Sequence, residues 1–283
     1  MTTLTIFPID ALDATDYIQS FIDKAEPGDT IVIPSGQIFM VNATRGIRLK
    51  SDITFQIDGT LQAIPTAPNA VYFVIALFGC NNVTICGSGS ICGERYGRPQ
   101  YGDDSGFGIF IQVGNNIVIR DVTCKYFWGD GILVDYGLAE NGLTTNVLIE
   151  RVKSIFNHRQ GLTVGGVNGL IVRGCLFADI DGGAPGDGID IEPNAAFKIV
   201  ENIVIEGNTF KNTSGSNVGI DFGLGTFRKI SVRNNSHDLK SQPIWVGNTG
   251  KIDIPAWAKA LRASLGWWSG YRYWGYPTQW HGP

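Results

Sequence analysis

The chain has 283 residues, of which 43% are hydrophobic and 17% charged, a composition that excludes a disordered protein and supplies a continuous core. Its formal net charge of −4 provides no positive field for a phosphate backbone, so we expect no nucleic-acid partner. No apolar run reaches the roughly 18 residues of a membrane span, so we expect no membrane partner either. We predict one domain over residues 1–283.

The N-terminal segment predicts a helix and no export signal. Asp10, Asp13 and Asp16 stand where a secretory signal would be apolar, so a protein acting outside the cell or on a virus particle would reach its place by another route. Asp13 can cap a helix over about residues 14–25, within a cap region of about 10–25. We expect this helix to cover one end of the fold, through an apolar face formed by Tyr17, Ile18, Phe21 and Ile22.

Two kinds of short apolar strand then alternate along the chain. The first kind follows an Asn or Asp in most repeats, and its repeats start at Asp52, Asn82, Asn116, Asn146, Gly169, Asn202 and Arg228. The second kind opens with Gly and a branched residue in most repeats, at Gly108, Gly131, Gly161, Gly188 and Gly219. Regular strands with irregular spacing indicate coils stacked into a solenoid, with the insertions in the turns. We therefore predict an all-β right-handed parallel β-helix, with coils over about residues 30–250.

Side-chain alternation in the second strand kind predicts which residues form the core. By the period of two, Ile132, Leu162, Ile189 and Ile220 share one inward position, while Leu133, Thr163, Asp190 and Asp221 point outward. Asn208 and Asn235 fall at matching turns and are expected to form a hydrogen-bonded stack. The five cysteines are odd in number and lack a CxxC spacing, which predicts buried free thiols rather than a zinc site or a disulfide framework.

The segment of about residues 254–283 changes composition. Ile254 to Leu265 has a helical pattern, and the rest is rich in Trp and Tyr. We expect this tail to cap the last coil or to pack between chains, and stacking on sugar rings is the alternative.

Aligning the second strands by their glycines gathers ionisable residues on one wall. Asp130, Gln160, Asp187 and Val218 share a position, and His158 and Arg159 precede Gln160. Coils lie about 4.8 Å apart, which separates Asp130 from Asp187 by about 9.6 Å. Inverting glycosidases hold their carboxyl groups roughly 6.5 to 9.5 Å apart. We predict Asp187 as general acid and Asp130 as general base, with Arg159 lowering the pKa of one carboxyl.

The same wall permits β-elimination on a uronic acid. Arg159 would neutralise the substrate carboxylate, and His158 or Tyr126 would serve as base or acid. Trp128 can stack on a sugar or simply cover a turn. The predicted substrate-binding residues are Trp128, Gln160, Asp190, Glu192 and Asp221. Asp190, Glu192 and Asp221 could instead hold Ca²⁺, but a plain solvated acidic face is the preferred reading and no cofactor is predicted.

Four segments carry a resemblance to a known family. Residues 13–23 and 26–36 resemble the opening of the pectate-lyase-like β-helix superfamily, and residues 53–63 and 82–93 look like the early coils of polygalacturonase-type glycoside hydrolases. Gly129-Asp-Gly-Ile and Gly186-Asp-Gly-Ile resemble the first catalytic element of that group. The Asp-Asp pair and the Arg-Ile-Lys segment are missing; Arg228-Lys-Ile is a scrambled version of the latter.

The resemblance and the residues together predict an enzyme that cleaves a polysaccharide, acidic by preference. We favour a glycoside hydrolase. A polysaccharide lyase or uronate epimerase is one alternative, and a non-catalytic glycan-binding or structural protein of a phage tail or surface appendage, assembled as a homotrimer, is another.

Overall fold

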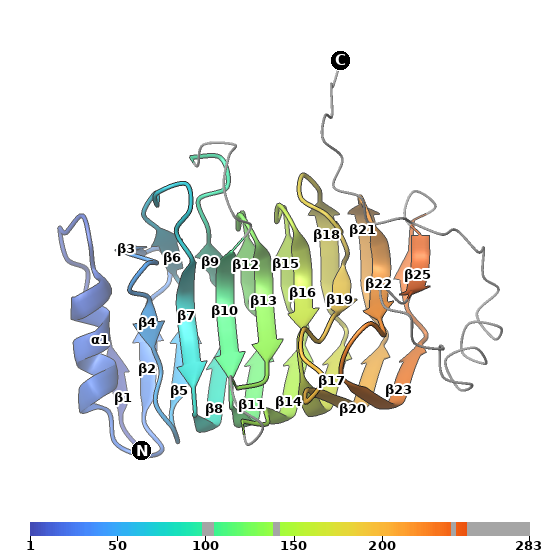
Figure 1. Ribbon diagram of the computed structural model, residues 1–283. Coiled ribbons are helices and arrows are strands. Elements are labelled where there is room, and N and C mark those ends of the chain that lie inside the picture. Colours follow the sequence, from blue (N-terminus) through green and yellow to red (C-terminus); the bar gives the residue numbers. More distant parts are fainter. Residues whose placement is uncertain (98–104, 138–141, 239–241, 248–283) are drawn as a thin grey trace.

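The protein is a solenoid of three parallel sheets with a helix at its N-terminal end, as seen in a computed structural model (Figure 1). The structure describes residues 1–97, 105–137, 142–238 and 242–247. The predicted C-terminal tail, about residues 254–283, lies outside the described residues. In the described part of the chain, no helix has the length and apolar character to cross a membrane.

Each coil contributes one strand to each sheet. Strands that follow each other in the sequence therefore belong to different sheets, and strands that pair within a sheet come from successive coils. Sheet A contains β1 (Thr3–Thr5), β2 (Thr30–Ile33), β5 (Thr54–Ile57), β8 (Asn81–Cys86), β11 (Asn115–Arg120), β14 (Thr145–Glu150), β17 (Val167–Arg173), β20 (Ile199–Glu206) and β23 (Thr226–Arg233).

The other two sheets have eight strands each. Sheet B contains β3 (Ile38–Val41), β6 (Thr60–Ala63), β9 (Ser90–Cys92), β12 (Thr123–Lys125), β15 (Lys153–Ile155), β18 (Leu176–Ile180), β21 (Thr209–Thr213) and β24 (Ser236–His237). Sheet C contains β4 (Ile47–Arg48), β7 (Tyr72–Phe78), β10 (Gly106–Gln112), β13 (Asp130–Asp135), β16 (Gln160–Val164), β19 (Ile189–Ile191), β22 (Ser216–Asp221) and β25 (Gln242–Gly247).

The predicted N-terminal helix is present as α1 (Thr15–Lys24). The Asp13 carboxylate accepts hydrogen bonds from the N–H and the hydroxyl of Thr15, at 2.9 and 2.6 Å, and so satisfies a donor of the first turn. Ile18 and Ile22 are fully buried in the core, which is the apolar face that the spacing predicted.

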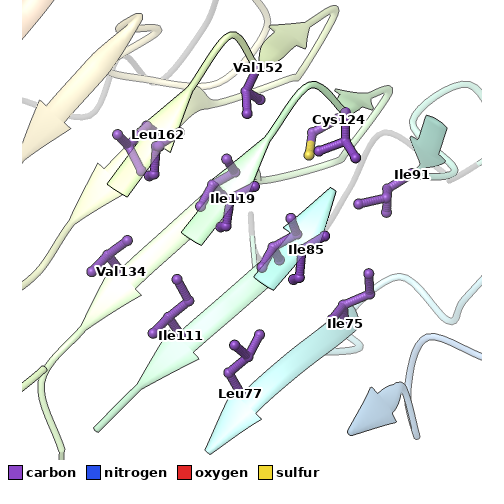
Figure 2. Close-up of a cluster of buried hydrophobic side chains, with 14 of the residues drawn as sticks. Ile75, Leu77, Ile85, Ile91, Ile111, Ile119, Cys124, Val134, Val152 and Leu162 are labelled. Carbon is purple, nitrogen blue, oxygen red and sulfur yellow. The ribbon is translucent and has the colours of Figure 1, made fainter. Parts of the chain in front are cut away.

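Inward side chains from the three sheets fill the solenoid. Ile85 and Ile119 of sheet A, Cys124 of sheet B, and Ile111 and Val134 of sheet C converge in the interior (Figure 2). All five cysteines are buried and free, as predicted.

One register prediction is wrong. Ile189 pairs with Val218 and Ile191 with Ile220, so the last aligned coil is displaced by two residues from the alignment by glycines. Gly219 therefore stands beside Asp190.

Asparagines shape the turns. The residue that opens most sheet A repeats has a left-handed backbone, with φ of 55° at Asn82, 57° at Asn116 and 56° at Asn202. Asn tolerates this conformation better than most residues, which explains the repeated Asn in the sequence. The predicted stack is confirmed, because Asn208 Nδ2 donates to Asn235 Oδ1 at 3.0 Å.

Candidate functional site

The site lies on the outer face of sheet C, where parallel pairing aligns residues that are distant in the chain. Asp130 pairs with Gln160, and the pairing of Leu162 with Ile189 places Asp187 next in that line. A second line, three residues further along each strand, consists of Leu133, Thr163, Asp190 and Gly219. Three predicted residues, Asp130, Gln160 and Asp187, thus share one wall, and Ser216 rather than Val218 occupies the fourth position of their line.

Asp130 and Arg159 form a bidentate ion pair. Arg159 Nε donates to Asp130 Oδ1 at 2.8 Å and Nη2 to Oδ2 at 2.6 Å, and the Thr163 hydroxyl adds a bond to Oδ2 at 2.7 Å. Asp130 is fully buried, whereas the Arg159 side chain is 23% exposed. Both carboxylate oxygens of Asp130 are therefore engaged by donors within the protein. The predicted role of Asp130 as general base therefore does not fit, and Asp130 instead orients Arg159.

The charge of Asp130 also acts on Arg159. Burial alone would lower the pKa of the guanidinium, but the charge and hydrogen bonds of Asp130 outweigh burial and raise it. Arg159 is therefore a fixed cation in a partly dry environment. Asp130 engages Nε and Nη2, whereas no residue of the described part of the chain hydrogen-bonds Nη1.

Asp190 and Glu192 form a protonatable pair. Asp190 is buried and accepts a hydrogen bond from Gln160 Nε2 at 2.5 Å, and Glu192 follows it two residues later. Burial, and then the nearby charges of Glu192 and Asp187, raise the pKa of Asp190 well above its ordinary value. Burial also raises the pKa of Glu192, although Arg159 opposes this shift. The expected solvated acidic face is wrong here: the pair retains a proton at a pH where exposed carboxyls are ionised.

Asp187 reaches the same place from the preceding turn. It is buried, and its Oδ1 accepts a hydrogen bond from the Ser216 N–H. A side chain at Gly219 would collide with Asp187 Oδ2 and lie 3.1 Å from Asp190 Oδ1, so both carboxyl groups converge over Gly219. Only glycine leaves this space open.

Asp221 occupies a different register position from the predicted one. Because Ile220 pairs with Ile191, Asp221 follows in line with Glu192 rather than with Asp190. Its Oδ1 accepts a hydrogen bond from the Gly223 N–H at 2.8 Å, within its own turn.

His158 and Trp128 lie on the turns that lead into sheet C. Their rings stack at 4.1 Å with an interplanar angle of 10°, and Trp128 is 5% exposed. The predicted stacking of Trp128 on a sugar does not fit, because His158 covers one indole face and the side chain is buried. The alternative prediction, that Trp128 covers a turn, describes the structure.

Tyr126 belongs to an aromatic stack on the turn after sheet B. Its ring lies 5.5 Å from Phe156 and 5.4 Å from Tyr96, and its φ is 64°. The structure thus gives Tyr126 aromatic neighbours rather than the carboxyl groups of sheet C.

Thr163 is a site residue that sequence reasoning missed. Its hydroxyl contacts both Asp130 and the Gln160 side chain, so it links the ion pair to the carboxyl pair. The sequence pattern that could have identified Thr163 is its predicted outward position, in line with Leu133 on one neighbouring coil and Asp190 on the other. Within the described ranges, no group of three or more His, Cys, Asp or Glu side chains is arranged for a metal ion.

Comparison with known proteins identifies the family. The family described as a right-handed beta helix region matches residues 75–254. The chain belongs to this right-handed β-helix family. The predicted β-helix superfamily is thereby confirmed.

One curated relative of this β-helix protein is the uncharacterized protein YclG of Bacillus subtilis (strain 168), 32% identical over 190 residues. That match covers 59% of this chain and 32% of the relative, so the chain spans about a third of the relative's length.

Three solved structures share the β-helix fold. The endo-xylogalacturonan hydrolase from Aspergillus tubingensis has a TM-score of 0.64 at 15% identity, covering 91% of this chain and 80% of that one. The Dettilon tailspike protein has a TM-score of 0.63 at 16% identity, covering 90% and 48%. The alginate lyase from Paenibacillus sp. str. FPU-7 has a TM-score of 0.50 at 15% identity, covering 87% and 99%. At these identities the likeness shows the fold alone.

Proposed function

We propose that the protein cleaves glycosidic bonds of an acidic polysaccharide on the outer face of sheet C. The observation that carries this proposal is the Asp190–Glu192 pair, two adjoining carboxyl groups with raised pKa values beside the fixed Arg159 guanidinium. A carboxyl group whose pKa is raised above its ordinary value is what a glycosidase needs as its general acid. The names of similarly folded proteins, a xylogalacturonan hydrolase and an alginate lyase, support the substrate class.

Each carboxyl group has a role in this proposal. Glu192 is less buried than Asp190, so it donates its proton to the leaving glycosidic oxygen. Burial, and then the nearby charge of Asp130, raise the pKa of Glu192 and so favour its protonated state, while Asp190 beside it accepts a hydrogen bond from Gln160. Asp187 points into the same space and accepts the proton of the attacking water. Arg159 Nη1 binds a substrate carboxylate, which accounts for the preference for an acidic chain.

Hydrolysis fits this geometry better than elimination. Elimination needs a base at the C5 proton of a uronic acid, and the predicted candidates are held elsewhere: His158 against Trp128 and Tyr126 against Phe156. The raised pKa values of the Asp190–Glu192 pair suit proton donation, which hydrolysis requires at the leaving group.

The test is incubation of the full chain with polygalacturonate, xylogalacturonan and alginate, followed by assays for new reducing ends and for the ultraviolet absorbance of unsaturated products. We expect reducing ends without that absorbance. Glu192→Gln should lower turnover about 10²- to 10⁴-fold, the usual contribution of a general acid. Glu201→Gln, a half-buried glutamate on sheet A, is the matched control and should leave turnover unchanged.

Three results would contradict the proposal. Unsaturated products would indicate elimination. Full turnover by Glu192→Gln would remove Glu192 as the acid. Binding of a polysaccharide with no cleavage would indicate a non-catalytic glycan-binding protein.

A further inference from the structure

Four phenylalanine rings form a cluster on β7 and β10 of sheet C, here called the phenylalanine platform: Phe73, Phe78, Phe107 and Phe110. The rings of Phe78 and Phe110 are 5.4 Å apart and nearly perpendicular, and Phe73 lies 5.4 Å from Phe78. Phe107 lies 5.8 Å from Phe110. Phe78 is 40% exposed, so an aromatic surface remains open to solvent in a cluster rather than as a scattered side chain.

The platform is in register with the carboxyl pair on the same outer face. Phe110 pairs with Leu133, Leu133 with Thr163, and Thr163 with Asp190. The strands β7, β10, β13, β16 and β19 lie side by side along the solenoid (Figure 1). Three coil steps of about 4.8 Å separate Phe110 from Asp190, roughly 14 Å in all.

A parallel line connects Phe78 to Glu192. Phe78 pairs with Gln112 and Gln112 with Asp135, and Glu192 continues the line two coils beyond Asp135. Four steps give roughly 19 Å. One coil step is close to the length of one pyranose residue with its linkage. Consider a glycan that lies along the solenoid axis with one glycosidic bond at Glu192. The sugar three or four residues away from that bond then lies over the platform.

We propose that the phenylalanine platform is a remote sugar-binding subsite, which stacks on the C–H face of a pyranose three to four residues from the bond at Glu192. This inference rests on the proposed function for the place of cleavage. Pyranose rings carry an apolar face of C–H groups, and aromatic side chains supply the matching surface. The side chains on the line between the platform and the acid are polar: Gln112 Nε2 donates to the Tyr136 carbonyl at 3.2 Å, and Asp135 pairs with Lys198.

The size of the platform favours a glycan over a second copy of the chain. A stable protein interface buries about 800 Å² on each partner. The platform covers two neighbouring strands, Phe107 is only 8% exposed, and Phe78 is the one ring of the four exposed beyond a third. That surface suits one or two sugar rings.

The test measures affinity against chain length by titration calorimetry. The probes are oligogalacturonides and, separately, alginate oligosaccharides, from dimer to hexamer, and the protein is the full chain with Glu192→Gln to prevent cleavage. We expect the hexamer to bind more tightly than the dimer. Adding Phe78→Ala or Phe110→Ala should weaken hexamer binding about two- to tenfold and bring the ratio of hexamer to dimer affinity towards one.

Controls separate stacking from folding. Phe7→Ala removes a phenylalanine that is 66% exposed in the N-terminal segment and should keep the length dependence. Phe110→Trp preserves an aromatic face and should keep it as well. Melting temperatures are compared throughout, and if Phe110→Ala does not fold, the more exposed Phe78→Ala provides the test.

Several outcomes would overturn the inference: a length dependence unchanged in Phe78→Ala, no binding of either series of oligosaccharides, or a trimer that dissociates in Phe78→Ala. The last would make the platform an interface between copies. The proposed function fails separately: if the wild-type chain cleaves nothing but the hexamer preference still depends on Phe78, the subsite stands and only the hydrolase assignment falls.

Discussion

Sheets A and C use the same strand stacking but place charges very differently. On sheet A, pairing aligns residues of alternating charge in successive coils, and the series is Arg120, Glu150, Arg173, Glu206 and Arg233. The arginines of this series are exposed, 50% for Arg173, whereas the glutamates are partly buried, with Glu150 12% exposed. On sheet C the Arg159–Asp130 pair is 23% and 0% exposed. The fold thus supplies the alignment in both sheets, and burial decides what the charges do.

The difference in burial between the two sheets indicates which charged groups are suited to catalysis. Exposed pairs are solvated and screened, so their effect on stability is small. On sheet C, Asp190 and Glu192 are poorly solvated, and burial raises the pKa values of both carboxyl groups. We therefore expect the reactive groups on sheet C, where the charged side chains are buried.

The largest expected effect on stability is at the sheet C ion pair. Arg159→Met leaves the buried Asp130 carboxylate without its partner and should lower the free energy of unfolding by about 3–5 kcal/mol, measured by urea denaturation. The double variant Asp130→Leu with Arg159→Met removes both charges and should recover most of that loss. A single variant as stable as the wild type would contradict the burial of Asp130.

A pH-dependent effect is expected at Asp190. Folding raises the pKa values of Asp190 and Glu192, so the unfolded chain releases these protons more readily. The contribution of this pair to stability should therefore be fully present below the ordinary carboxyl pKa values of 3.8 and 4.5, and it should be lost as pH rises through the raised folded values.

Asp190→Asn should flatten that decline. We expect the free energy of unfolding to change by on the order of 1 kcal/mol or more. Each kcal/mol corresponds to about 2–4 °C in melting temperature for a chain of this size. Thermal melts across the acidic to neutral range measure it. Asp221→Asn on the neighbouring strand is the control and should keep the decline. A steeper decline in Asp190→Asn would reverse the sign of the argument.

The smallest effect is expected on sheet A. Arg173→Ala removes an exposed pair with Glu150 and should change stability by less than about 1 kcal/mol, with the difference shrinking further in high salt. A loss as large as that of Arg159→Met would show that the two sheets do not differ as proposed.

The amino-acid sequence by itself determined the coil architecture, the N-terminal helix, the Asn208–Asn235 stack and the common wall of Asp130, Gln160 and Asp187. These follow from local periodicity and from the few residues that tolerate left-handed turns. Only the tertiary structure decided that Asp130 is enclosed by Arg159 and Thr163, that Asp190 is buried, and that Val218 pairs with Ile189. Burial depends on side chains from neighbouring coils, and register on how each connection crosses between sheets, neither of which the spacing of glycines along one chain records.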